Sequence, residues 1–273
     1  MTITLLMTGR MLRRGLIGLA SLLLAILLFE MVIPPVADSL GGTDGLEALI
    51  RTLPPSIQAL TRTRPEFIAV SGLAGYLSTG FTHPLYITLT SAALVTFTAR
   101  GLAGEMERGT IQLALARSVS RPRVYLSRVL GLVIVVTALS VAGMVGLLLG
   151  MAIARPAGTL VWWHLLTTIS VCWLLFWAIG GLALCGSAAA DTTSRAVGWA
   201  TTGIVIFYVI DYLATIWSLI EPLGFISLFD YYDPADALVN GRIPLDHALV
   251  LALAGLAGVA GGYTVFTRRD LPT

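Results

Sequence analysis

The feature that most constrains this chain is a series of apolar runs long enough to cross a lipid bilayer. A membrane-spanning helix needs about 20 mainly apolar residues. Only 12% of the 273 residues are charged, against about 25% in a typical soluble domain. Because backbone polar groups find no water partners inside lipid, such runs predict an all-α membrane protein, a helical bundle. We predict one transmembrane domain over residues 1–273, with six spans at about residues 15–33, 72–100, 124–153, 162–188, 196–219 and 247–266.

The distribution of arginine predicts the orientation of these spans. All 17 basic residues are arginine, and the chain has no lysine. Loops on the cytoplasmic side of a membrane carry an excess of positive charge. With both termini inside, 12 arginines fall on the inner side and five on the outer side: Arg51, Arg62, Arg64, Arg155 and Arg242. We therefore expect an N-in, C-in topology.

A charged insert separates the second and third spans, at about residues 102–117. Its charges predict that it lies in water on the inner side, and its pattern is compatible with one helix. On that helix the apolar residues face the bilayer or the bundle, namely Met106, Leu113 and Ala114. The polar residues lie largely toward the other sides: Glu105, Arg108, Gln112 and Arg117. The insert is either a surface onto which a partner docks or a plain positively charged loop with an interfacial helix.

Two outer segments are long enough for structure of their own. A short amphipathic helix is predicted over about residues 46–53, which Pro54 and Pro55 end. The segment from Glu221 to Asp246 mixes apolar, aromatic and acidic residues. Its composition predicts short helices half-sunk in the outer leaflet, between the fifth and sixth spans.

Several kinds of chemistry have no support in the sequence. Without lysine the chain has no phosphate-binding P-loop, so it is not expected to hydrolyse ATP itself. Cys172 and Cys185 both lie in one apolar run, where buried small hydrophobic residues are expected. The histidines lack metal-ligand spacing, and the arginines do not cluster with aromatic residues. We expect no metal site, no cofactor bound by this chain and no nucleic-acid partner.

Two acidic residues within or near the spans are candidates for a role in substrate binding or gating. Asp211 lies one or two turns from the outer end of the fifth span, and Glu30 lies closer to the outer surface in the first. A carboxylate near the bilayer centre costs about 2.5–3.5 kcal/mol on insertion scales, so such groups are usually functional or paired. The alternative for Asp211 is an interfacial acid satisfied by Tyr208 or Tyr212.

The insert resembles the conserved motif of ABC-2 type permeases, the membrane subunits of bacterial ATP-binding-cassette exporters. Residues 104–111 read Gly-Glu-Met-Glu-Arg-Gly-Thr-Ile, and residues 118–121 read Ser-Val-Ser-Arg. Weaker matches occur at residues 53–55 with 75–77, at 231–238 and at 266–271. The chain departs from the family pattern in having Ser118 where proline is usual and Arg128 where lysine is usual.

The resemblance implies that residues 102–117 form a coupling helix held by a separate ATPase subunit. It implies two such ATPase subunits, which bind ATP and Mg, and a second permease subunit, identical or different. It also implies export across a bacterial inner membrane, with surrounding lipid, of a hydrophobic or amphipathic substrate. The positions assigned to ATPase coupling are Glu105, Glu107, Arg108, Gly109, Thr110, Arg117 and Arg121.

Two other classes of function are weighed against this one. A proton-coupled secondary transporter that uses Asp211 is the alternative, although few polar groups lie in mid-membrane. An intramembrane hydrolase would need a paired nucleophile and base, and no such pair is recognisable in the sequence.

Overall fold

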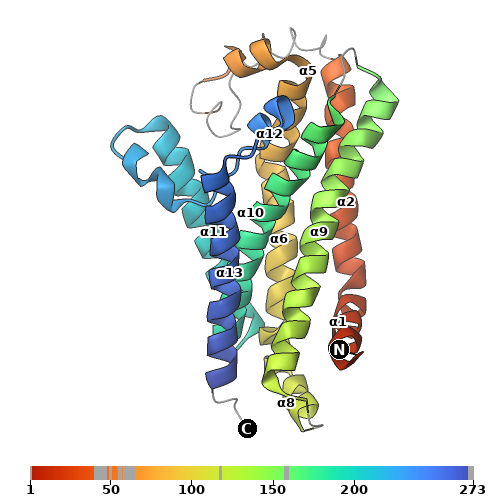
Figure 1. The fold of residues 1–273 in the computed structure, drawn as a ribbon, viewed down its shortest axis with the longest axis vertical. Helices are drawn as coiled ribbons and strands as arrows, with labels where there is room; N and C mark the ends of the chain where they lie inside the picture. Colours follow the sequence, from red (N-terminus) through yellow and green to blue (C-terminus); the bar gives the residue numbers. More distant parts are fainter. Residues whose placement is uncertain are drawn as a thin grey trace.

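The computed structural model describes residues 2–39, 48, 51–54, 57, 65–116, 119–156 and 160–269, and over these residues it contains helices and no strand. Six segments are long and apolar enough to cross a membrane, in agreement with the predicted number. Both termini lie at one end of the upright bundle (Figure 1), which we call the terminal end. The helices of these segments are α2 (Leu16–Ser39), α6 (Pro84–Gly101), α9 (Arg121–Ala154), α10 (Trp162–Ala189), α11 (Thr193–Ile216) and α13 (Leu245–Arg268).

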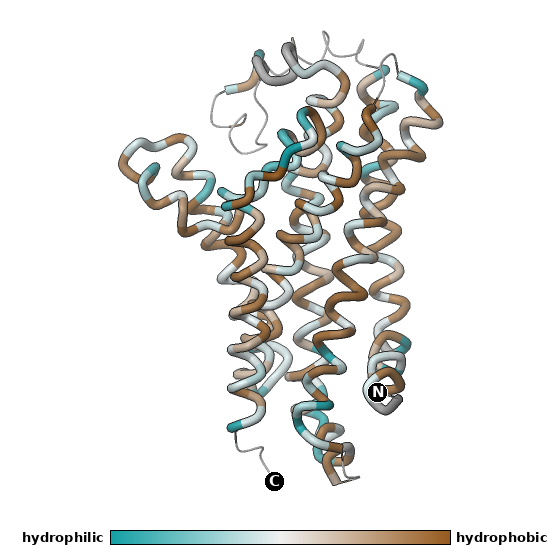
Figure 2. The backbone as a smooth tube through the Cα atoms, viewed as in Figure 1, coloured by the Kyte–Doolittle hydropathy of each residue, from teal (hydrophilic) through white to brown (hydrophobic). Residues whose placement is uncertain are grey.

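The long helices differ in how much of their surface is buried, and on this basis some are central and others peripheral. Within their apolar windows, 61% of the residues of α10 and of the segment that begins with α6 are buried, against 11% in α2 and α11. Figure 2 shows apolar residues along the length of the bundle and hydrophilic residues mainly toward its two ends. The peripheral helices therefore present apolar faces to the surroundings, as helices in lipid do.

The first span is longer than predicted. We expected it to end near Ile33, but α2 continues through Pro34 and Pro35 to Ser39. Prolines remove backbone donors, and neighbouring helices can compensate in a membrane. The carbonyls that lose these donors are those of Glu30 and Met31, and α9 packs against the Met31 carbonyl and Pro34 at Gly150. The Tyr76 hydroxyl also binds α2, since it donates to the Ile33 carbonyl at 2.9 Å.

A helix that the sequence did not predict precedes this span. Helix α1 (Thr2–Arg14) is amphipathic and packs against the start of α9. The Thr8 hydroxyl donates to the Ser127 carbonyl at 3.0 Å, which fixes α1 to α9.

The second span is preceded by a further helix, α5 (Pro65–Thr82), which turns sharply at Gly72. Gly72 has a φ of 56°, a conformation that favours glycine. His83 then caps α6, because its Nδ1 atom accepts from the Leu85 N–H at 3.1 Å. A helical segment thus begins near Gly72, where the second span was predicted to start, and it is interrupted before Pro84.

Short helices occupy the segment between α11 and α13, as predicted. They are a 3₁₀ helix, η1 (Glu221–Ile226), and α12 (Pro234–Asn240). Asp233 caps α12 by accepting from the N–H groups of Ala235 and Asp236. Helix α12 packs against α10 and α5 at the end of the bundle opposite the termini (Figure 1). The amphipathic helix predicted over residues 46–53 lies mostly outside the described residues.

Glycines allow close contacts between the long helices. A Cβ atom at Gly146 would collide with the Leu27 carbonyl, so α9 approaches the backbone of α2 at that point. A Cβ atom at Gly258 would collide with the backbone at Gly181, so α13 approaches α10 in the same way. Small residues permit such backbone contact between membrane helices.

We predict that Gly146→Leu destabilises the bundle by about 1–3 kcal/mol, because the added side chain must separate α9 from α2. The measurement is unfolding of the purified protein in detergent micelles. Gly203→Leu is the matched control, since nothing lies within 4 Å of a Cβ atom at that helical position. Equal stability of the two variants would contradict the packing described here.

Candidate functional site: the insert between α6 and α9

The insert consists of two short helices rather than the single predicted helix, and that prediction is wrong. Helix α7 spans Ala103–Glu107 and α8 spans Thr110–Leu115. The break falls at Gly109, whose φ of 69° is left-handed and favours glycine over other residues. The Gly109 N–H donates to the Met106 carbonyl at 3.0 Å, and the Thr110 hydroxyl donates to the Glu105 carbonyl at 3.0 Å. The sequence Gly-Thr therefore makes a compact turn inside the insert.

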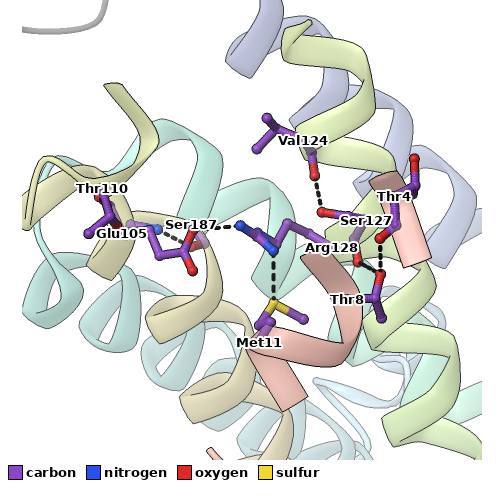
Figure 3. Close-up of polar contacts among 10 residues, drawn as sticks. Thr4, Thr8, Met11, Glu105, Thr110, Val124, Ser127, Arg128 and Ser187 are labelled. Carbon is purple, nitrogen blue, oxygen red and sulfur yellow. Dashed lines mark hydrogen bonds and ion pairs between the residues drawn. The ribbon is translucent and has the colours of Figure 1, made fainter. Parts of the chain in front are cut away.

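Glu105 points into the bundle, where it forms an ion pair with Arg128 of α9. The Arg128 Nη2 atom lies 2.5 Å from the Glu105 Oε2 atom, and the side chains are 3% and 13% exposed. The Arg128 Nη1 atom also lies 3.4 Å from the Met11 sulfur of α1 (Figure 3). The predicted placement of Glu105 away from the bundle is wrong. The cause is a partner 23 residues further along the chain, which helical spacing within the insert does not reveal.

Glu107 binds the first turn of α11. Its Oε2 atom accepts from the Thr193 backbone N–H at 2.9 Å and from the Thr193 hydroxyl at 2.6 Å. A carboxylate at a helix N-terminus is stabilised by the unpaired N–H groups there. Glu107 thus joins the insert to the fifth span, although its own side chain stays exposed.

Arg121 forms hydrogen bonds with the C-terminal end of α13, the sixth span. Its Nη1 atom donates to the carbonyls of Thr267 and Arg269, at 3.2 and 2.5 Å. Arg269 in turn donates to the Ala188 and Ala190 carbonyls, at 3.2 and 3.0 Å, and pairs with Asp191. The start of α9, the end of α13 and the loop after α10 are joined at the terminal end. The sequence assigned no site role to Arg269 or Asp191, although Arg269 lies in the charged run of residues 268–270.

The remaining part of the insert is exposed on one side only, because Ile111 of α8 is 1% exposed and belongs to the hydrophobic core. Helix α8 lies beyond the ends of the long helices (Figure 1). Met106 is 6% exposed and faces the bundle, one of the two placements expected for it, whereas Leu113 is 69% exposed and faces away from the bundle. Arg108, Ala116 and Arg123 are also exposed. We call Arg108, Leu113 and Ala116 the insert surface; Arg117 lies outside the described residues.

The two candidate acids lie in different places. Glu30 is fully buried, and neither of its carboxylate oxygens has a hydrogen-bond partner among the described residues. Its side chain is the more enclosed of the two. Asp211 is 8% exposed and lines a cavity of about 640 Å³ together with Glu221 and Asp230. Among the described residues no group of histidine, cysteine and acidic side chains has the arrangement of a metal site.

These features define a multi-pass membrane protein with an insert fixed to its helices at the terminal end. A family model described as ABC-2 family transporter protein matches residues 9–271, and the chain belongs to this family. A search of curated proteins finds no match. The family membership agrees with the resemblance carried by residues 104–111.

We predict that Glu105→Gln destabilises the protein by about 3 kcal/mol, because it leaves the Arg128 guanidinium buried without its carboxylate. Unfolding in detergent micelles measures the loss. Arg195→Met serves as the control, since its pair with Asp191 is exposed (63% and 54%) and is worth about 1 kcal/mol or less.

A double-mutant cycle isolates the pair itself. Combining Glu105→Gln with Arg128→Met removes both charges. The double variant is therefore expected to lose less free energy of unfolding than the two single variants lose in sum. Strict additivity of the two substitutions would show that the charges do not interact.

Proposed function

We propose that this chain is the permease subunit of an ATP-driven exporter and that the insert surface is where a separate ATPase subunit docks. The observation that supports this most is the contrast within the insert. Its inner side is bonded to α9 and α11 through Glu105 and Glu107, while Leu113 and Arg108 are exposed. Arginine is enriched at protein interfaces, and an exposed apolar side chain such as that of Leu113 is stabilised when a partner covers it.

The connections of the insert to the long helices support the proposal that a movement of the insert is passed on to several spans. Helix α7 follows α6 directly, and α8 leads into α9. A force applied at Leu113 therefore acts on α6 and α9 through the backbone, and on α11 through the hydrogen bonds to Thr193. ATP binding by the ATPase subunits would in this way rearrange three spans together.

The assembly that we propose has two permease subunits and two ATPase subunits, in a bacterial inner membrane with both termini inside. ATP and Mg belong to the ATPase subunits, and the permease contributes no catalytic residue. The second permease is identical to this chain or a related one. The cargo is hydrophobic or amphipathic and leaves toward the outside.

A proton-coupled transporter that uses Asp211 is the second candidate. Its support is the burial of Asp211 in a cavity with two further acids. That function requires transport to continue without ATP and to stop when the proton gradient is dissipated. Asp211→Asn would then abolish transport, whereas the exporter that we propose would still respond to ATP.

We expect Leu113→Glu and Arg108→Glu each to weaken binding of the ATPase encoded beside this chain by about tenfold or more, because truncating or reversing a central contact costs about 2 kcal/mol. Co-purification and ATP turnover in proteoliposomes are the measurements. Leu223→Glu and Arg242→Glu introduce the same changes at exposed positions near the opposite end of the chain's fold and serve as controls. Unchanged binding by the insert variants, or ATP turnover by the permease alone, would refute the proposal.

A further inference from the structure

A second cavity, of about 730 Å³, lies between α1–α2 on one side and α6–α8 on the other. Its volume is in the range of about 300–1,000 Å³ that is typical of ligand sites. The walls differ in character along its length. Leu19, Leu22 and Phe97 line one part, and Arg100, Arg108 and Thr110 line another. The cavity is therefore amphipathic, with its polar part at the insert.

The charge of the polar part is positive. Glu105 is the one acid among the described lining residues, and it is already paired with Arg128. Arg100 and Arg108 have exposed side chains at the end of α6 and just after α7. Guanidinium groups bind phosphate oxygens through two parallel hydrogen bonds. The polar part thus suits a phosphate group better than a cation or a neutral headgroup.

The apolar part has open space at two glycines of the α1–α2 junction. Nothing lies within 4 Å of a Cβ atom built at Gly18, and only the Met11 carbonyl, at 4.0 Å, approaches one built at Gly15. Both glycines line the cavity, and α2 and α6 belong to segments that cross the membrane. A lipid acyl chain is the apolar group that surrounds such helices and can enter the cavity between them.

We infer that this cavity binds an anionic phospholipid from the leaflet at the terminal end. Its phosphate lies between Arg100 and Arg108, and one acyl chain lies along Gly18, Leu19 and Leu22 against Phe97. Basic pockets between membrane helices are known to recognise anionic lipid headgroups in this manner. The inference rests on the membrane placement of the chain and not on the proposed docking of an ATPase.

The site has a consequence for the insert. Arg108 belongs both to the cavity and to the insert surface, and Thr110 lines the cavity while its hydroxyl holds the turn at Glu105. A bound phosphate would restrain the Arg108 side chain and the turn at Gly109. The lipid would then fix the shape of the surface that faces the partner.

The test uses the full chain, purified in detergent without any ATPase, and native mass spectrometry after incubation with equal amounts of phosphatidylglycerol and phosphatidylcholine. We expect the wild type to retain one phosphatidylglycerol in preference to phosphatidylcholine. Arg100→Gln is expected to reduce that retention about tenfold, as loss of a charge-assisted hydrogen bond would. Gly18→Leu is expected to abolish it, because the new side chain occupies the space of the acyl chain.

Matched controls keep the test specific. Arg123→Gln removes an exposed arginine of α9 outside the cavity, and Gly198→Leu adds the same side chain at a helical glycine of α11 with nothing within 4 Å. Both are expected to bind lipid as the wild type does, and melting temperatures confirm that all variants fold. Equal retention of the two lipids, equal losses in test and control variants, or full displacement of the lipid by millimolar inorganic phosphate would overturn the inference.

Discussion

The arrangement of the terminal end depends on the ion pair between Glu105 and Arg128. The pair is almost sealed from water, with Arg128 3% exposed. Breaking such a pair leaves a charge without compensation in a medium of low dielectric constant, which costs several kcal/mol. The insert therefore does not swing freely on its two connections to the spans. It is held as part of the bundle, and only its outer side is available to a partner.

The packing of the long helices determines which of them would move together with the insert. Helix α9 is joined to α2 through the close approach at Gly146, and α10 is joined to α13 through Gly258. Backbone contacts at glycines leave little room for sliding, because the interiors of such interfaces are densely packed. A displacement of α9 would thus carry α2 with it. The bonds from Arg121 and Tyr125 of α9 to α13 and the residue that follows it would oppose sliding of α9 past that helix.

The sequence predicted the number of spans and the position of the insert, because apolar length and charge are local properties of a chain. It could not predict which way Glu105 points, since the residue that decides this, Arg128, lies in another span. It also missed the break at Gly109, because one glycine does not exclude a helix, and the extension of α2 through Pro34 and Pro35, because neighbouring helices supply the compensating contacts.

Six arginines of the terminal end fall into two groups that a count of positive charges does not separate. Arg121, Arg128 and Arg269 are bonded to other spans, whereas Arg100, Arg108 and Arg123 are exposed. The first group uses a property that lysine lacks, a planar fork whose nitrogens bond to several partners at once. Arg128 contacts Glu105 of α7 through one terminal nitrogen and Met11 of α1 through the other. A single side chain of α9 therefore connects the amphipathic N-terminal helix to the insert. The lipid cavity lies between those same two elements, so its occupant would contact both parts that Arg128 holds together.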